Sequence, residues 1–178
     1  MNYDTIKEEI KNIDITLPPP QEEPERQYYF IKKMQHWMEE KKAEKGRELT
    51  CCVNTFGCQM NARDSEKIIG ILMTIGYKVV EDEDADLVIF NTCTVRENAN
   101  LKVYGRLGQL KKYKNKNPEM ITMLCGCMMQ EESVVEKIKK SYRNVDVIFG
   151  THNIFKFAEL LSMKVLDRAD NKKMIIDV

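Results

Sequence analysis

The sequence predicts an α/β fold in which a parallel sheet is wound on both faces by helices. From about residue 50 onward, short apolar segments alternate with longer segments whose apolar residues recur at helical spacing. Two of the apolar segments, 85–92 (ADLVIFNT) and 145–150 (VDVIFG), are too apolar for a strand with an exposed face. Strands of this kind alternating with helices are typical of a doubly wound parallel sheet.

The first 48 residues are expected to form an extension outside this sheet. Residues 1–25 end in the proline- and acid-rich stretch LPPPQEEPE, which favours extended, solvated chain, so the extension is expected to be partly disordered. The segment 26–48 carries aromatic and methionine residues at helical spacing, and Gly46 is suited to end a helix there. We therefore expect one amphipathic helix that packs its aromatic face on the domain. A helix that binds a partner is the alternative.

Five strands and four helices are expected in the remainder of the chain. The strands are expected at 49–56, 77–81, 85–92, 119–125 and 145–150. The helices are expected at 62–76, 95–117, 130–142 and 154–163. Such an alternation suits the flavodoxin-like strand order 2-1-3-4-5. Residues 49–167 would then form one domain, and residues 168–178 a linker that leaves it.

Three cysteines fall at the carboxyl ends of predicted strands. Cys58 follows the first strand, Cys93 the third and Cys127 the fourth. In a parallel sheet these ends lie on one edge, and in the order 2-1-3-4-5 the three strands are neighbours. The crevice where such folds bind ligands lies between the first and third strands. The sequence therefore predicts that Cys58, Cys93 and Cys127 converge on one site.

The chemistry of this predicted site favours a metal. Thiolates are good metal ligands, and a helix N-terminus lowers the pKa of a cysteine placed there. Gly57 and Gly126 would let the backbone turn closely beneath a ligand. Structural zinc usually takes four ligands from paired Cys-x-x-Cys segments, and the sequence has no such pair. Three widely spaced soft ligands fit a 4Fe–4S cluster that keeps one iron open, with structural zinc as the alternative.

The other cysteines are expected to pack rather than to bind. Cys51 and Cys52 are adjacent in one strand, so they point to opposite faces of the sheet, where cysteine serves as a small apolar side chain. Cys125 competes with Cys127 as a ligand, but Cys127 follows a glycine as the first predicted ligand does. His152 follows the last strand, and a role in a turn or cap is expected there rather than ligation.

Composition excludes several classes of protein. Lys and Arg number 28, and so do Asp and Glu, so no global basic field draws the chain to nucleic acid. The lysines of 111–116 (KKYKNK) are expected to be a solvated helix end rather than an RNA contact. No apolar run approaches a membrane span, and the charged start lacks the apolar core of a secretory signal. The 6 cysteines are therefore expected in the reducing cytoplasm.

Four motifs together resemble the N-terminal domain of the methylthiotransferases, which are radical S-adenosylmethionine enzymes. They are TFGCQMNARDSE, DLVIFNTCTVRENA, GCMMQ and VDVIFGTHN, and the resemblance covers about residues 49–163. The first two are most similar to the branch that modifies tRNA. The resemblance implies that Cys58, Cys93 and Cys127 hold an auxiliary 4Fe–4S cluster. It further implies that the cluster takes part in adding a methylthio group to C2 of N6-isopentenyladenosine beside the anticodon.

The sequence departs from the family pattern beyond this domain. The family's central domain carries a Cys-x-x-x-Cys-x-x-Cys motif for a second 4Fe–4S cluster used with S-adenosylmethionine, and this sequence has none. A C-terminal RNA-binding domain is also missing from it. We therefore expect a part of a longer enzyme, with tRNA and the two other domains as partners and without catalytic competence by itself. A flavodoxin-like electron-transfer protein and a structural zinc domain are the alternatives.

Overall fold

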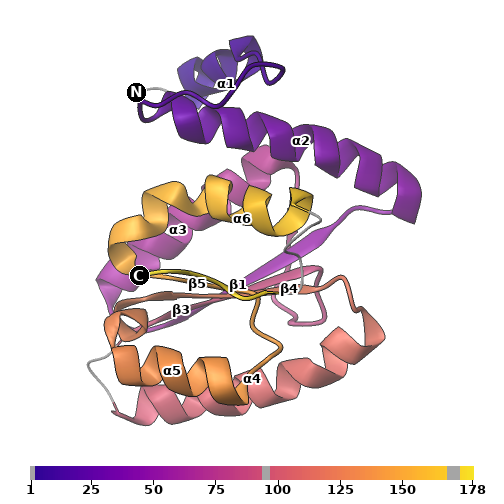
Figure 1. The fold of residues 1–178 in the computed structure, drawn as a ribbon. Coiled ribbons are helices and arrows are strands. Elements are labelled where there is room, and N and C mark those ends of the chain that lie inside the picture. Colours follow the sequence, from indigo (N-terminus) through magenta and orange to yellow (C-terminus); the bar gives the residue numbers. More distant parts are fainter. Residues whose placement is uncertain (1–2, 94–96, 168–172) are drawn as a thin grey trace.

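The structure of the chain is a computed structural model that describes residues 3–93, 97–167 and 173–178 (Figure 1). Within these residues a six-stranded parallel sheet lies between layers of helices. The strands are β1 (Thr50–Phe56), β2 (Lys78–Val79), β3 (Leu87–Thr92), β4 (Ile121–Gly126), β5 (Val147–Phe149) and β6 (Ile175–Asp177). The α-helices are α1 (Tyr3–Asn12), α2 (Glu25–Lys45), α3 (Gln59–Ile75), α4 (Glu97–Lys116), α5 (Glu132–Ser141) and α6 (Phe157–Leu166). Two 3-10 helices are η1 (Cys127–Gln130) and η2 (Thr151–Lys156).

Helices cover both faces of the sheet, as the sequence predicts. In Figure 1, α3 and α6 lie above the sheet, whereas α4 and α5 lie below it. Each face has its own apolar core. Phe149 and Phe157 belong to the core under α3 and α6, and Phe90 to the core over α4 and α5. All six residues of β3, at the centre of the sheet, are buried. The doubly wound α/β fold is therefore confirmed.

The strand order is β2-β1-β3-β4-β5-β6, and every pairing is parallel. The first five strands follow the predicted flavodoxin-like order 2-1-3-4-5. The register aligns Phe56 of β1 with Thr92 of β3, and Thr92 with Gly126 of β4. Because these are the last residues of their strands, the segments that follow them leave from one edge of the sheet.

The sheet has one strand more than the five predicted. β6 pairs with β5 in parallel, from Val147 opposite Ile175 to Phe149 opposite Asp177. It comes from residues 168–178, for which the sequence predicted no strand. A run of three residues is too short to show a strand periodicity in the sequence. It becomes a strand because it pairs with the edge of β5 that would otherwise be unpaired.

Two predicted helices begin later than expected. The segments 130–142 and 154–163 were expected to be α-helical from their first residues, but η1 and η2 precede α5 and α6. Such 3-10 turns are frequent at the start of helices, where the chain leaves a strand within a few residues. The first two residues of the expected helix 95–117 lie outside the described residues.

The N-terminal extension contains two helices, whereas the sequence predicted one. α1 buries Ile10 against the core, and Ile6 and Ile13 are partly buried beside it. These isoleucines lie at helical spacing, but charged neighbours and the short length obscured the signal in the sequence. None of the helices among the described residues combines the length and the apolarity that crossing a membrane requires.

The predicted packing of the segment 26–48 on the domain is confirmed. α2 crosses over α3 and α6 on the outside, as Figure 1 shows. Its residues Met34 and Met38 are completely buried in the core that α3 and α6 share. Gly46 ends the helix with φ of 64°, in the left-handed region that glycine adopts without strain.

We predict that Met38→Ala lowers the free energy of unfolding by about 2–5 kcal/mol, because it removes a fully buried side chain and leaves a cavity. Urea denaturation followed by circular dichroism measures this change. Met73→Ala is the matched control, since Met73 on α3 is 59% exposed, and its effect should stay within about 0.5 kcal/mol. Equal effects of the two substitutions would show that α2 is not part of the core.

Candidate metal centre

The three predicted ligands lie at the carboxyl edge of neighbouring strands. Cys58 precedes the first residue of α3 as its N-cap, two residues beyond the end of β1. Cys93 directly follows β3, and Cys127 directly follows β4 as the first residue of η1. Cys58 is exposed, Cys127 is half-buried and Cys93 is buried. The strand register therefore brings the three corners to one edge.

Cys93 packs against the corner that carries Cys58, because its Cβ atom lies against Gly57, the residue before Cys58. The pKa of Cys58 lies below its ordinary value, chiefly because the backbone N–H groups of Asn61 and Met60 at the start of α3 hydrogen-bond its sulfur, and also because of the Cys93 thiol. This is the effect expected of a helix N-terminus on a cysteine. The pair therefore presents one acidified, exposed thiol beside one buried thiol.

Cys127 is held separately from this pair. The hydroxyl of Thr151, at the start of η2, donates to its sulfur at 3.6 Å. Among residues 3–93, 97–167 and 173–178, no group of three or more histidine, cysteine or carboxylate side chains is disposed around one point as metal ligands. The structure thus packs the Cys58 corner against Cys93 and places Cys127 on the same edge, without closing the three into one such group.

Two glycines allow the corners to approach closely. Gly126 has φ of 101°, and a Cβ atom there would lie 2.1 Å from the carbonyl oxygen of Thr92. A Cβ atom at Gly57 would lie 2.7 Å from the Cβ atom of Cys93 and 2.5 Å from Oδ1 of Asn61. Neither position has room for a side chain, so both glycines are required for this packing.

The remaining cysteines lie in the cores, as the sequence predicts. Cys51 belongs to the core on the α3 side and Cys52 to the core on the α4 side. Burial raises the pKa of Cys51 to about 12 and that of Cys52 to about 11. Complete burial also raises the pKa of Cys125. These thiols stay protonated near neutral pH, which disfavours them as metal ligands.

Sequence reasoning missed the side chains that support the cysteines. Asn61 contacts Cys58, Asn91 contacts Asn61, and Thr151 contacts Cys127. A sequence signal existed for Asn61, because it lies three residues after the N-cap, where a capping box places its second polar side chain. His152, which the sequence singled out beside the last strand, is exposed in η2.

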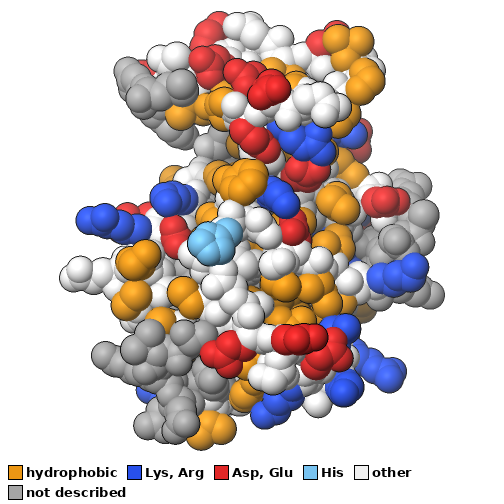
Figure 2. Space-filling model, turned by 60° about the vertical axis from the view of Figure 1, so that its left-hand side comes forward, with side chains coloured by type: hydrophobic (Ala, Val, Ile, Leu, Met, Phe, Trp, Pro, Cys, Tyr) orange, Lys and Arg blue, Asp and Glu red, His pale blue; other side chains and the backbone are white. Residues whose placement is uncertain are grey.

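Figure 2 shows a face on which apolar, acidic and basic side chains are interspersed, without a field of one charge. Beside the cysteine edge, Met60 is 71% exposed and Phe155 is 53% exposed. Met60 is separated from Cys58 by one residue, and Phe155 lies in η2 with Thr151. Two large apolar side chains are therefore exposed near the described cysteine corners.

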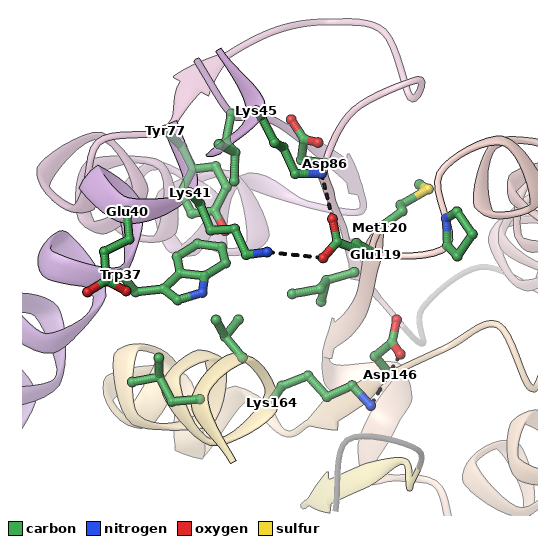
Figure 3. A pocket seen from close by; sticks show the side chains of 15 residues that line it. Trp37, Glu40, Lys41, Lys45, Tyr77, Asp86, Glu119, Met120, Asp146 and Lys164 are labelled. Carbon is green, nitrogen blue, oxygen red and sulfur yellow. Dashed lines mark hydrogen bonds and ion pairs between the residues drawn. The ribbon is translucent and has the colours of Figure 1, made fainter. Parts of the chain in front are cut away.

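A pocket of about 590 Å³ lies at the opposite edge of the sheet (Figure 3). Its lining includes Asp86 and Asp146, each of which directly precedes a strand. Lys41 and Lys45 pair with Glu119 at 3.1 and 2.7 Å across it. Its charged groups thus neutralise one another, and the pocket is separate from the cysteine edge.

A family model described as "Uncharacterized protein family UPF0004" matches residues 50–150, from the start of β1 to the end of β5. The chain belongs to this family. The matched segment contains all three cysteines of the edge and omits α1, α2 and β6.

Several relatives of this UPF0004 chain are named tRNA-2-methylthio-N(6)-dimethylallyladenosine synthase. The protein from Lachnoclostridium phytofermentans is 64% identical over 135 residues, which are 76% of this chain and 29% of the relative. The protein from Acetivibrio thermocellus is 49% identical over 158 residues, 88% of this chain and 32% of the relative. The protein from Clostridioides difficile is 47% identical over 169 residues, 94% of this chain and 34% of the relative. The predicted resemblance to tRNA-modifying methylthiotransferases is confirmed, and the chain spans about a third of the length of these relatives.

We predict that Gly126→Ala lowers the free energy of unfolding by at least about 1 kcal/mol, because it forces a side chain into the left-handed region and against the Thr92 carbonyl. Gly105→Ala is the matched control. Gly105 lies within α4 with open space around it, so alanine there should raise the stability by about 0.5–1 kcal/mol. Thermal and urea unfolding measure both. Similar effects of the two changes would contradict the close approach of β3 and β4 at this edge.

Proposed function

We propose that this chain is the domain of a tRNA methylthiotransferase that binds the auxiliary 4Fe–4S cluster, with Cys58, Cys93 and Cys127 as its ligands. The shared name of the relatives supports the reaction, since it describes the synthesis of 2-methylthio-N6-dimethylallyladenosine in tRNA. The observation that carries the ligand assignment is the strand register. It aligns the ends of β1, β3 and β4, so that each of the three corners at one edge bears a cysteine.

The donor set at this edge fits an iron–sulfur cluster. A 4Fe–4S cluster held by three thiolates keeps one iron open for an exogenous sulfur atom. The start of α3 favours the thiolate of Cys58, and the backbone N–H groups there are suited to donate to sulfur. Cys93, being buried, would exclude water from its side of the site, and the Thr151 hydroxyl would donate to the sulfur of Cys127. Hydrogen bonds to sulfur raise a cluster's reduction potential by stabilising its more negative, reduced form.

The whole enzyme would add the methylthio group to C2 of N6-isopentenyladenosine next to the anticodon. In this proposal a radical S-adenosylmethionine domain supplies the second 4Fe–4S cluster, and a C-terminal domain holds the tRNA. Both would belong to the remaining length of these relatives, of which this chain matches about a third. The reaction would take place in the cytoplasm, and this chain alone would bind the auxiliary cluster without catalysing methylthiolation.

We predict that anaerobic reconstitution with iron and sulfide gives about four irons per chain and a charge-transfer absorption, as a 4Fe–4S site requires. Single alanine substitutions at Cys58, Cys93 or Cys127 should abolish this absorption, because two thiolates leave the cluster exposed and labile. Iron and sulfide analysis with visible absorption measures the result. Cys125→Ala is the matched control at the neighbouring, buried thiol, and it should retain the cluster.

The same experiment separates this function from its alternatives. Uptake of zinc with no bound iron would favour a structural zinc domain and overturn the cluster. Retention of the cluster by Cys127→Ala with loss by Cys125→Ala would reverse the ligand assignment. Each variant is compared after its metal-free form has shown cooperative unfolding, so that loss of the cluster is not confused with loss of the fold.

A further inference from the structure

Two buried asparagine side chains lie beneath the cysteine corners. Asn61 is in the first turn of α3 and is 2% exposed, and Asn91 is the penultimate residue of β3 and is fully buried. Burying an amide is unfavourable unless its donors and acceptors are paired. The partners of these two amides therefore show what holds the corners in place.

Asn61 connects the two corners that carry Cys58 and Cys93. Its Oδ1 atom accepts hydrogen bonds from the backbone N–H and the thiol of Cys58, both at 3.3 Å. Its Nδ2 atom donates to the carbonyl oxygen of Thr92 at 3.2 Å, and Thr92 directly precedes Cys93. One amide thus binds the end of β3 with one atom and the Cys58 corner with the other.

Asn91 determines which way this amide points. Its Nδ2 atom donates to the backbone carbonyl of Asn61 at 2.8 Å and to the hydroxyl of Ser65 at 3.1 Å. Because a carbonyl oxygen only accepts, the Oδ1 atom of Asn91 is left to accept from Nδ2 of Asn61, at 3.1 Å. Oδ1 of Asn61 must therefore face Cys58. Ser65 is itself paired with Thr55 at 2.7 Å, which fixes the far end of the network on β1.

Asn61 and Cys93 pack tightly on either side of Gly57, so a change of the side chain at Asn61 would alter the packing around Cys58 and Cys93. The position of a Cβ atom at Gly57 would lie 2.5 Å from Oδ1 of Asn61 and 2.7 Å from the Cβ atom of Cys93. Asn61, Gly57 and Cys93 therefore touch without free space between them. Of the two hydrogen bonds that Oδ1 of Asn61 accepts from Cys58, only the one from the thiol needs the thiol proton. The bond from the backbone N–H therefore persists when Cys58 becomes a thiolate.

We propose that Asn61 is a positioning residue for the cluster ligands, and that Asn91 orients it. Together they hold Cys58 beside Cys93 before any metal binds, so that less conformational freedom is lost on cluster binding. The part of this inference that concerns cluster binding rests on the proposed function. Its geometric part concerns the thiol pair alone and is testable without a cluster.

Two measurements on the reduced chain test the role of Asn61. The first uses the metal-free protein and phenylarsine oxide, which condenses with two neighbouring thiols to form two As–S bonds and releases the arsenic-bound oxygen, with both thiol protons, as water. Cys58→Ala gives the background. The second follows the loss of charge-transfer absorption from the reconstituted protein in the presence of an iron chelator. Asn61→Ala is expected to slow the first reaction and to accelerate cluster loss, each by about 10-fold or more, the usual effect of removing a side chain that supports a metal ligand.

Asn144→Ala is the matched control for these measurements. Asn144 is also a buried amide, 8% exposed, and its Nδ2 atom donates to the carbonyl of Leu107 at 2.9 Å. It lies before β5, at the edge of the sheet opposite the cysteines. Its loss should lower the stability of the fold but leave both the arsenical reaction and the cluster lifetime at their parent values.

The outcomes distinguish positioning from a purely structural role. If Asn61→Ala and Asn144→Ala lower stability alike and both keep parent rates, Asn61 only supports the fold and the proposal is wrong. If Asn61→Ala does not fold, Asn61→Asp replaces it: this variant keeps the volume and the Oδ1 acceptor, loses the donor to Thr92, and should show the same two changes. If the parent reacts with the arsenical faster than Asn61→Ala does but takes up no cluster, the positioning of the thiol pair stands and the proposed function falls.

Discussion

The parallel register of β1, β3 and β4 is the constraint on which the candidate site depends. It sets Phe56, Thr92 and Gly126 side by side as the last residues of their strands. A shift of one residue would reverse the faces to which the side chains of β3 point, and would separate the buried Asn91 and Thr92 from their hydrogen-bond partners. Because β3 is buried along its whole length, the cores hold this register, and the register in turn places the cysteine corners.

The corners are close enough that they restrict one another. Thr92 accepts from Asn61 through its carbonyl and donates through its hydroxyl to the carbonyl of Cys125 at 2.8 Å, so one residue is bonded to the segments on both sides. Gly126 lies against the carbonyl of Thr92, and no side chain would fit at this position. The end of β3 thus connects the Cys58 corner to the Cys127 corner.

The sequence predicted the parts of this structure that follow from periodicity and strand order. Continuous apolar runs identified β3 and β5, and parallel order then placed Cys58, Cys93 and Cys127 on one edge. It did not predict β6, whose conformation depends on the free edge of β5, nor the contacts of Asn61 and Asn91. Side-chain partners 30 residues apart in sequence, such as this pair, arise from tertiary packing and leave no periodic signal.

The two edges of the sheet are built with opposite chemistry. At the amino edge, Asp86 accepts from the backbone N–H of Thr50 at 2.9 Å, and Asp146 accepts from that of Thr122 at 2.8 Å. Burial alone would raise the pKa of Asp86, but hydrogen bonds from Arg47 and the Thr50 N–H outweigh it and hold the pKa below its ordinary value. Both carboxylates accept hydrogen bonds from the backbone at the start of a strand and pair with Arg or Lys side chains. At the carboxyl edge the corners carry thiols instead, two of them directly after a glycine, and the exposed Cys58 sulfur accepts hydrogen bonds from backbone N–H groups of its own turn. The amino edge is thus fixed by ion pairs around a pocket of about 590 Å³, whereas the carboxyl edge ends in the three cysteine corners that the proposed cluster would use.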